Sequence, residues 1–119
     1  MNGTSASILE SVKKLLGISE DDDGFDQEIK DLINSEFLTL NQLGVGPKEG
    51  FSINGPTETW DSYTSDTFLL NSIREFVYLR VRKVFDPSAS TTVDSAIQDR
   101  INELEFRINV QAEGGASGS

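Results

Sequence analysis

The stretch FDQEIKDLINSEFLTLNQLG, residues 25–44, decides the fold class of this chain. Its apolar side chains recur every three or four residues, which places them on one face of an α-helix. They are Phe25, Ile29, Leu32, Ile33, Phe37, Leu40 and Leu43. Gly44 is typical of the residue that ends a helix. The carboxylates of Asp21, Asp22, Asp23 and Asp26 cluster at the start, where they favour the positive end of the helix dipole and are interpreted as capping and solvated charge.

Three more segments have the same helical period. They cover residues 7–16, 67–85 and 92–110. Ser7 and Glu10 have the spacing of a capping box, and Thr91 and Asp94 repeat that spacing before the last segment. Pro87 stops the third predicted helix, because proline cannot continue one. The sequence therefore predicts an all-α fold, a small four-helix bundle with one long irregular loop between its second and third helices.

That loop, residues 45–66, contains turn formers in place of a helical period. They are Gly46-Pro47, Gly50 and Asn54-Gly55-Pro56. Apolar residues on both sides of the Asn-Gly pair are compatible with a short β-hairpin over residues 51–63, although Pro56 weakens that interpretation. Trp60 and Tyr63 also lie in this loop. Loop aromatics either anchor a partner or close the end of a bundle, and both interpretations stay open.

Length and composition limit what the chain does. Its 119 residues are enough for one modest core, so we expect a single domain over residues 1–113 and a flexible Gly/Ser tail over 114–119. Acids outnumber bases 20 to 10, and a net charge of −10 excludes a basic nucleic-acid clamp. Cysteine and histidine are absent, which removes thiolate chemistry and the commonest general base. No apolar run approaches the roughly 20 residues of a membrane span.

Motifs for catalysis or for cofactor binding are absent from the sequence. There is no Gly-rich phosphate loop, Gly-x-Ser-x-Gly elbow or Ser-x-x-Lys box. The run of aspartates before Gly24 resembles a calcium loop, but Ser19 and Lys30 then occupy the two end positions where an EF-hand needs carboxylates. We therefore expect no catalytic residue, no cofactor and no metal site.

Two charged residues fall on apolar helix faces. Glu36 lies within the apolar stripe of residues 25–44, and Arg80 lies within that of residues 67–85. A charge on such a face must pair, reach water along its own stem or meet a partner. Their opposite signs suggest a buried ion pair between Glu36 and Arg80. The alternative, that both side chains reach water separately, stays open.

The helix predicted over residues 67–85 is apolar on more than one side. Its main stripe consists of Leu69, Leu70, Ile73, Phe76, Val77 and Val84. A stripe of about 100° is enough to join a core, so the apolar residues beside it are candidates for a subunit or partner interface. With the loop aromatics, the candidate interface residues are Trp60, Tyr63, Phe68, Tyr78, Leu79 and Phe85.

Charge is distributed unevenly between two segments. Residues 18–44 contain eight acids and one lysine, a net charge of −7. Residues 67–87 contain four bases and two acids, a net charge of +2. Such complementary segments favour the side-by-side association of like subunits.

Several stretches together resemble one known family. They are ILESVKKLLGIS at residues 8–19, FDQEI at 25–29, FVYLRVRKVFDP at 76–87 and EFRINVQAE at 105–113. In order and spacing they resemble the helices of the tailed-bacteriophage head–tail connector proteins, also called head-completion adaptors. The resemblance covers residues 8–113 and consists of helix and apolar patterns, without a catalytic signature.

The resemblance implies a function in assembly. A connector forms a ring of about a dozen copies under the portal protein, extends the DNA channel and docks the stopper or tail-completion protein. It also implies a place at the head–tail junction of the virion, after synthesis in the host cytoplasm. Packaged DNA would pass through without sequence-specific binding, and an acidic lumen suits this because it repels phosphates. We expect no membrane among its partners.

Two other classes of function stay open. One is an acidic DNA mimic or another small helical protein-binding module. A DNA mimic would present acids in a regular surface array, whereas the acids of this chain cluster at one helix start. An enzyme would need a carboxylate-lined pocket, and the sequence does not locate one.

Overall fold

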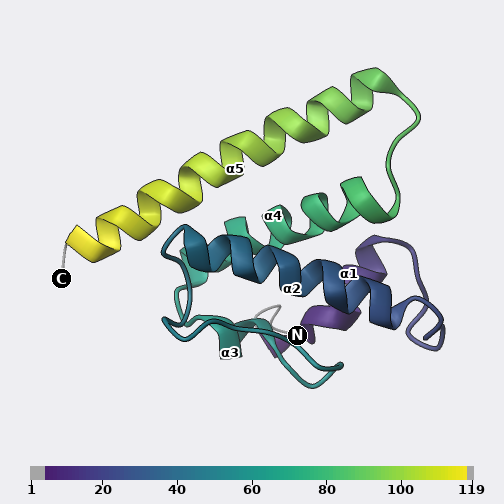
Figure 1. Cartoon of the computed structure of the whole chain (residues 1–119), viewed down its shortest axis with the longest axis horizontal. Helices are drawn as coiled ribbons and strands as arrows, with labels where there is room; N and C mark the ends of the chain where they lie inside the picture. The colour runs from purple at the N-terminus through teal and green to yellow at the C-terminus, as the bar shows by residue number, and fades with distance from the viewer. Residues whose placement is uncertain (1–4, 118–119) are drawn as a thin grey trace.

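Five helices make up the part of the chain that the computed structural model describes, residues 5–117 (Figure 1). They are α1 (Ile8–Leu15), α2 (Asp26–Gln42), α3 (Trp60–Tyr63), α4 (Thr67–Phe85) and α5 (Thr91–Ser117). The predicted all-α class is confirmed. None of the described helices combines the length and the apolar composition that a membrane span requires.

The four longer helices are arranged as a row (Figure 1). α4 lies between α2 and α5, and α1 packs against α2. In the figure α5 forms the upper edge of the molecule, with α4 below it and α1 lower still. The bundle detail of the prediction is not confirmed, and the position of α5 at the edge leaves much of its surface uncovered (Figure 1).

α2 buries the apolar stripe predicted for it. Ile29, Ile33, Phe37 and Leu40 are all buried. The helix ends before Gly44, whose φ of +84° lies in the left-handed region that glycine adopts without a Cβ penalty. Its N-cap is Phe25, which provides no side-chain hydrogen bond, while the predicted acidic helix start is present, with Asp26 and Glu28 in the first turn.

Capping side chains set the starts of α1 and α4. The Ser7 hydroxyl accepts a hydrogen bond from the Glu10 N–H at 3.2 Å, as the predicted capping box requires of its first residue. Asp66 accepts from the Leu69 N–H at 3.1 Å, and α4 then runs over the predicted residues 67–85.

α5 differs from the predicted helix at both ends. The Ser90 hydroxyl accepts from the Val93 N–H at 3.3 Å, so Ser90 is the cap and the capping box predicted for Thr91 and Asp94 is wrong. The helix also continues to Ser117, past its predicted end at residue 110 and past the domain boundary predicted at residue 113. Residues 118–119 of the predicted tail lie outside the described residues.

The connection between α2 and α4 contains no hairpin. Within the described residues there is no strand, and one isolated β-bridge joins Ser7 to Thr59. The backbone groups that a hairpin would use are occupied. Ile53 donates to Asn34 Oδ1 at 2.8 Å and accepts from Asn34 Nδ2 at 3.0 Å, while Glu58 accepts from the Asn54 N–H at 3.0 Å. The loop is therefore fastened to α2 by a side chain, and the hairpin prediction is wrong.

Candidate functional site

The structure brings Glu36 of α2 and Arg80 of α4 together. Arg80 Nε donates to Glu36 Oε1 at 2.7 Å. The Glu36 side chain is 9% exposed and that of Arg80 is 35% exposed, so the carboxylate is buried while the guanidinium reaches water. The guanidinium carbon also lies 5.5 Å from the centre of the Phe76 ring. This contact joins two helices of one subunit, so neither group is free to meet a partner.

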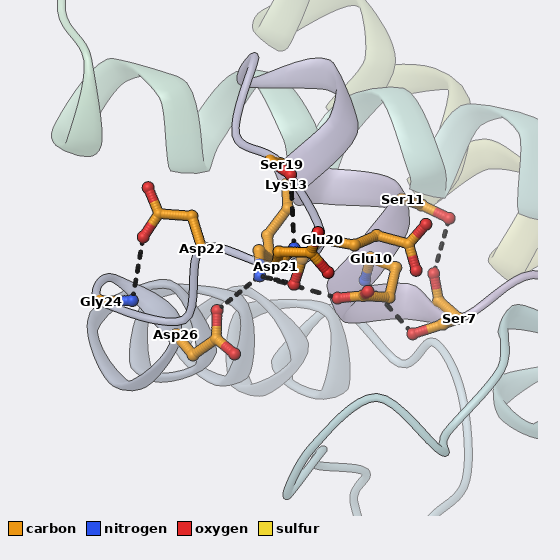
Figure 2. Close-up of polar contacts among 10 residues, drawn as sticks. All are labelled: Ser7, Glu10, Ser11, Lys13, Ser19, Glu20, Asp21, Asp22, Gly24 and Asp26. Atoms are coloured by element: carbon orange, nitrogen blue, oxygen red, sulfur yellow. Dashed lines mark hydrogen bonds and ion pairs between the residues drawn. The ribbon is translucent and has the colours of Figure 1, made fainter.

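A second charged contact surrounds Lys13, which sequence reasoning missed (Figure 2). Its side chain is 1% exposed, and Nζ lies 2.8 Å from Asp26 Oδ1 and 3.8 Å from Glu10 Oε1. Nζ also donates to the backbone carbonyl of Glu20 at 3.3 Å. The hydrogen bond with Asp26 is the main cause of a raised Lys13 pKa. Lys13 therefore fastens the acidic turn between α1 and α2.

Glu10 and Asp26 are not equally good counter-ions for Lys13. Burial, followed by a hydrogen bond with the Glu20 side chain, raises the pKa of Glu10 despite the attraction of Lys13. Asp26 thus provides the close counter-ion, while Glu10 is a carboxyl group whose charged form is disfavoured. The sequence does contain a signal for the burial of Lys13. This lysine follows the buried Leu9 by four residues, which places both on the same face of α1.

Trp60 and Tyr63 are part of the core. Both are buried, and their rings lie 6.4 Å and 4.8 Å from that of Phe37. Burial raises the pKa of the Tyr63 hydroxyl, which has no hydrogen-bond partner among the described residues. These two aromatics therefore close the end of the helical layer, and in this structure they are not available to a partner.

The four interface candidates on α4 range from buried to exposed. Leu79 is buried, Tyr78 and Phe85 are half-buried, and Phe68 is exposed. The Phe85 ring packs edge-on against Phe25 at 5.3 Å. Val84 of the predicted main stripe is exposed instead. Because α4 is covered by both α2 and α5, its buried residues spread around the helix beyond a single stripe.

Part of the predicted charge complementarity is used within the subunit. Arg80 pairs with Glu36, and Lys83 lies 3.8 Å from Asp94 and donates to Gln98 at 2.7 Å. In the described part of the chain, Arg74 and Arg82 form no ion pair. The guanidinium of Arg74 instead lies 5.6 Å from the centre of the Trp60 ring.

Two open grooves run along the helices. One, of about 310 Å³, lies between the start of α4 and the second half of α5, and is lined by Phe68, Phe106 and Val110 among others. The other, of about 830 Å³, follows α1 and includes Leu15, Ile18 and Arg74. The sequence analysis missed Phe106 and Val110. They could have been found as two large apolar residues that lie four positions apart on the otherwise polar side of α5.

Neither groove has the donors of a metal centre. No group of three or more aspartate or glutamate side chains with the spacing to hold a metal ion occurs within the described residues. The features that distinguish this surface are exposed apolar side chains and unpaired charges, which are properties of a surface for assembly.

Comparison with known families agrees with that description. A family model described as "Phage connector protein" matches residues 8–115. No curated protein and no solved structure matches the chain. The matched family is one of structural proteins rather than of enzymes, and its description supports a general role as a phage connector. The match spans nearly the whole sequence, so the chain belongs to the phage connector protein family.

Proposed function

We propose that copies of this chain form a ring at the head–tail junction of a phage particle. The ring lies under the portal protein, extends the DNA channel and presents a docking surface for the stopper or tail-completion protein. The observation that carries the proposal is the family match over residues 8–115. A phage connector acts by assembly, and this agrees with a sequence that contains no catalytic motif.

The exposed surface supports an assembly role. Phe68 is 83% exposed, Phe106 is 70% exposed and Val110 is 50% exposed, although all three are large apolar side chains. They line one groove, and clustered apolar exposure of this kind marks interaction surfaces. α5 provides much of it because the helix packs mainly against α4 and lies at the edge of the molecule (Figure 1).

The charge of the chain supports passage of DNA. A net charge of −10 per copy makes a ring of copies strongly negative. A negative wall repels phosphates, so DNA slides along it without being held. The ring therefore guides DNA without reading its sequence.

The test is to measure assembly with and without the portal protein. Light scattering after size-exclusion chromatography gives the mass of the particle, and negative-stain imaging gives its shape. We expect rings, either from the chain alone or upon addition of the portal. A chain that stays monomeric even with its portal present overturns the proposal.

A further inference from the structure

We infer that neighbouring copies join by packing exposed apolar side chains of α4 and α5 from one copy against the groove along α1 of the next. These side chains are Phe68 of α4 with Phe106 and Val110 of α5; each is at least half exposed, and together they are called the α5 ridge below. The groove along α1 contains Leu15, Ile18 and Arg74, and is called the α1 groove. The inference rests on the proposed ring and specifies which surfaces meet in it.

The α5 ridge is apolar and has acidic surroundings. Residues 91–113 contain five acids and two arginines, a net charge of −3. Both arginines are already engaged: Arg100 with Glu75 and Glu103, and Arg107 with Glu103. Asp99 and Glu105 are exposed and form no ion pair in the described part of the chain. A surface that receives the ridge must therefore provide apolar contact and free positive charge.

The α1 groove provides both. Its apolar lining includes Leu15, which is 56% exposed, together with Ala6 and Ile18. Lys14 and Arg74 line the same groove, and neither forms an ion pair within the described residues. Exposed apolar area next to unpaired cations complements a ridge with unpaired acids.

The α1 groove also contains two acids, Glu10 and Glu20. Lys13 Nζ lies near Glu10 and donates to the Glu20 backbone carbonyl at 3.3 Å (Figure 2), while the Glu20 side chain forms no ion pair within the described residues. Glu10 Oε1 lies 3.8 Å from Lys13 Nζ, and its hydrogen bond with the Glu20 side chain contributes to a raised pKa. Among the charges of the groove that form no ion pair within the described residues, the two cations therefore outnumber the single acid, Glu20.

Two other apolar sites on the surface fit the ridge less well. Phe25 and Phe85 pack together at one end of α4, next to the acidic turn that contains Asp21, Asp22 and Asp23. This turn would repel the acidic face of α5. Leu38 is a single exposed residue on α2, and isolated apolar residues are common on protein surfaces.

The two surfaces lie on different sides of the subunit. Arg74 lines the α1 groove and Ser72 lines the groove beside the ridge. Two residues along a helix are separated by about 200° around its axis, so α4 presents opposite faces to the two grooves. Figure 1 likewise places α5 and α1 on opposite sides of α4. A contact between different patches is heterologous, and it closes into a ring when its rotation allows.

Cysteine cross-linking provides the first test, because the natural chain has no cysteine. Leu15→Cys and Phe106→Cys variants are mixed in equal amounts, assembled and oxidised. We expect disulfide-linked heterodimers in clear excess over either homodimer, since residue 15 of one copy faces residue 106 of the next. Leu38→Cys mixed with Val93→Cys is the matched control, because both positions are exposed and neither belongs to the two surfaces.

Charge reversal provides the second test. Lys14→Glu and Glu105→Lys each remove one attraction, and each should weaken the association constant by about two- to fivefold. The double variant restores the opposite charges and should recover most of the loss. Both side chains are exposed, so the circular dichroism of the monomer should not change.

The outcomes separate the inference from the proposed function. Rings that form without cross-links between residues 15 and 106, or with as many in the control pair, overturn this contact and leave the ring proposal intact. Equal assembly of Lys14→Glu and the natural chain likewise counts against it. A chain that never assembles, even with the portal protein, overturns both proposals.

Discussion

Arg80 of α4 donates its Nε–H to Glu36 of α2 across 2.7 Å, and the two partners differ fourfold in exposure, 35% against 9%. That asymmetry makes the two single substitutions unequal. Arg80→Leu leaves a buried carboxylate without its partner and should lower the free energy of unfolding by about 1–3 kcal/mol. Glu36→Leu leaves a guanidinium that already reaches water, and should cost less than about 1 kcal/mol.

The double variant completes this prediction. Replacing Glu36 and Arg80 together by leucine removes both charges, so the loss should be smaller than that of Arg80→Leu alone. Urea unfolding of the four proteins measures the cycle. Small, equal and additive losses would show that the two side chains contribute independently.

The carboxylates around Lys13 should have opposite effects when they are neutralised. Asp26→Asn removes the anion 2.8 Å from a buried ammonium group, and should lower the free energy of unfolding by about 1–3 kcal/mol at pH 7. Glu10→Gln should leave stability unchanged or raise it, because folding disfavours the charged form of Glu10.

The sign follows from linkage. A carboxyl group whose pKa is raised by folding adds stability at low pH, and that contribution is lost as the pH rises through the folded-state pKa. At pH 7 the ionised Glu10 therefore opposes folding, and glutamine relieves this. Chemical unfolding at pH 7 compares the two variants. An equal loss for Glu10→Gln and Asp26→Asn would contradict the assignment of Asp26 as the principal counter-ion.

Local sequence rules predicted the helices well where period and end signals agree. The bounds of α4 follow from an apolar period that ends shortly before Pro87. The cap of α5 was misplaced because Ser90 and Thr91 are adjacent hydroxyl residues, and only the observed hydrogen bond distinguishes them. End signals thus located the start of α5 to within a residue, whereas its end, predicted at residue 110, lies at Ser117.

Local sequence rules could not predict contacts between segments that are distant in the sequence. Tyr63 is buried because the loop follows a path held by Asn34 and Ile53, which are 19 residues apart in the sequence. Burial of Lys13 likewise depends on a turn that brings Asp26 to it. The Glu36–Arg80 contact was accessible from sequence because each residue breaks an apolar stripe with a charge of opposite sign.

Gly46 should be intolerant of a side chain for two separable reasons. Its φ of +86° is unfavourable for other residues, and a Cβ there would lie 2.6–2.8 Å from the Tyr63 ring and hydroxyl. Gly44 has a similar φ of +84°, but a Cβ at that position would have no neighbouring atom within 4 Å, so Gly44→Ala isolates the backbone strain, about 1–2 kcal/mol. Gly46→Ala should cost more than this control. Thermal unfolding measures the stability of both variants. Equal losses of stability would show that the Tyr63 ring moves aside without destabilising the fold.

The attachment of α5 to α4 should weaken in acid. Arg100 holds Glu75 with two hydrogen bonds, from Nε at 2.7 Å and from Nη2 at 2.8 Å. These bonds are the main cause of a Glu75 pKa below the ordinary value of 4.5. A lowered carboxyl pKa gives stability that is present above the unfolded pKa and lost as the pH falls through the folded pKa.

The natural chain should therefore exceed Glu75→Gln in stability at pH 7, and the difference should shrink as the pH falls below 4.5. Both side chains are partly exposed, so solvent screening limits the difference to less than about 1 kcal/mol. Glu103→Gln is the matched control, because the partners of Glu103 are Arg100 and Arg107 on its own helix. Unfolding followed by circular dichroism from pH 7 to pH 3 measures the three proteins. A difference between the natural chain and Glu75→Gln that stays constant over that range would mean that the ion pair does not hold α5 against α4.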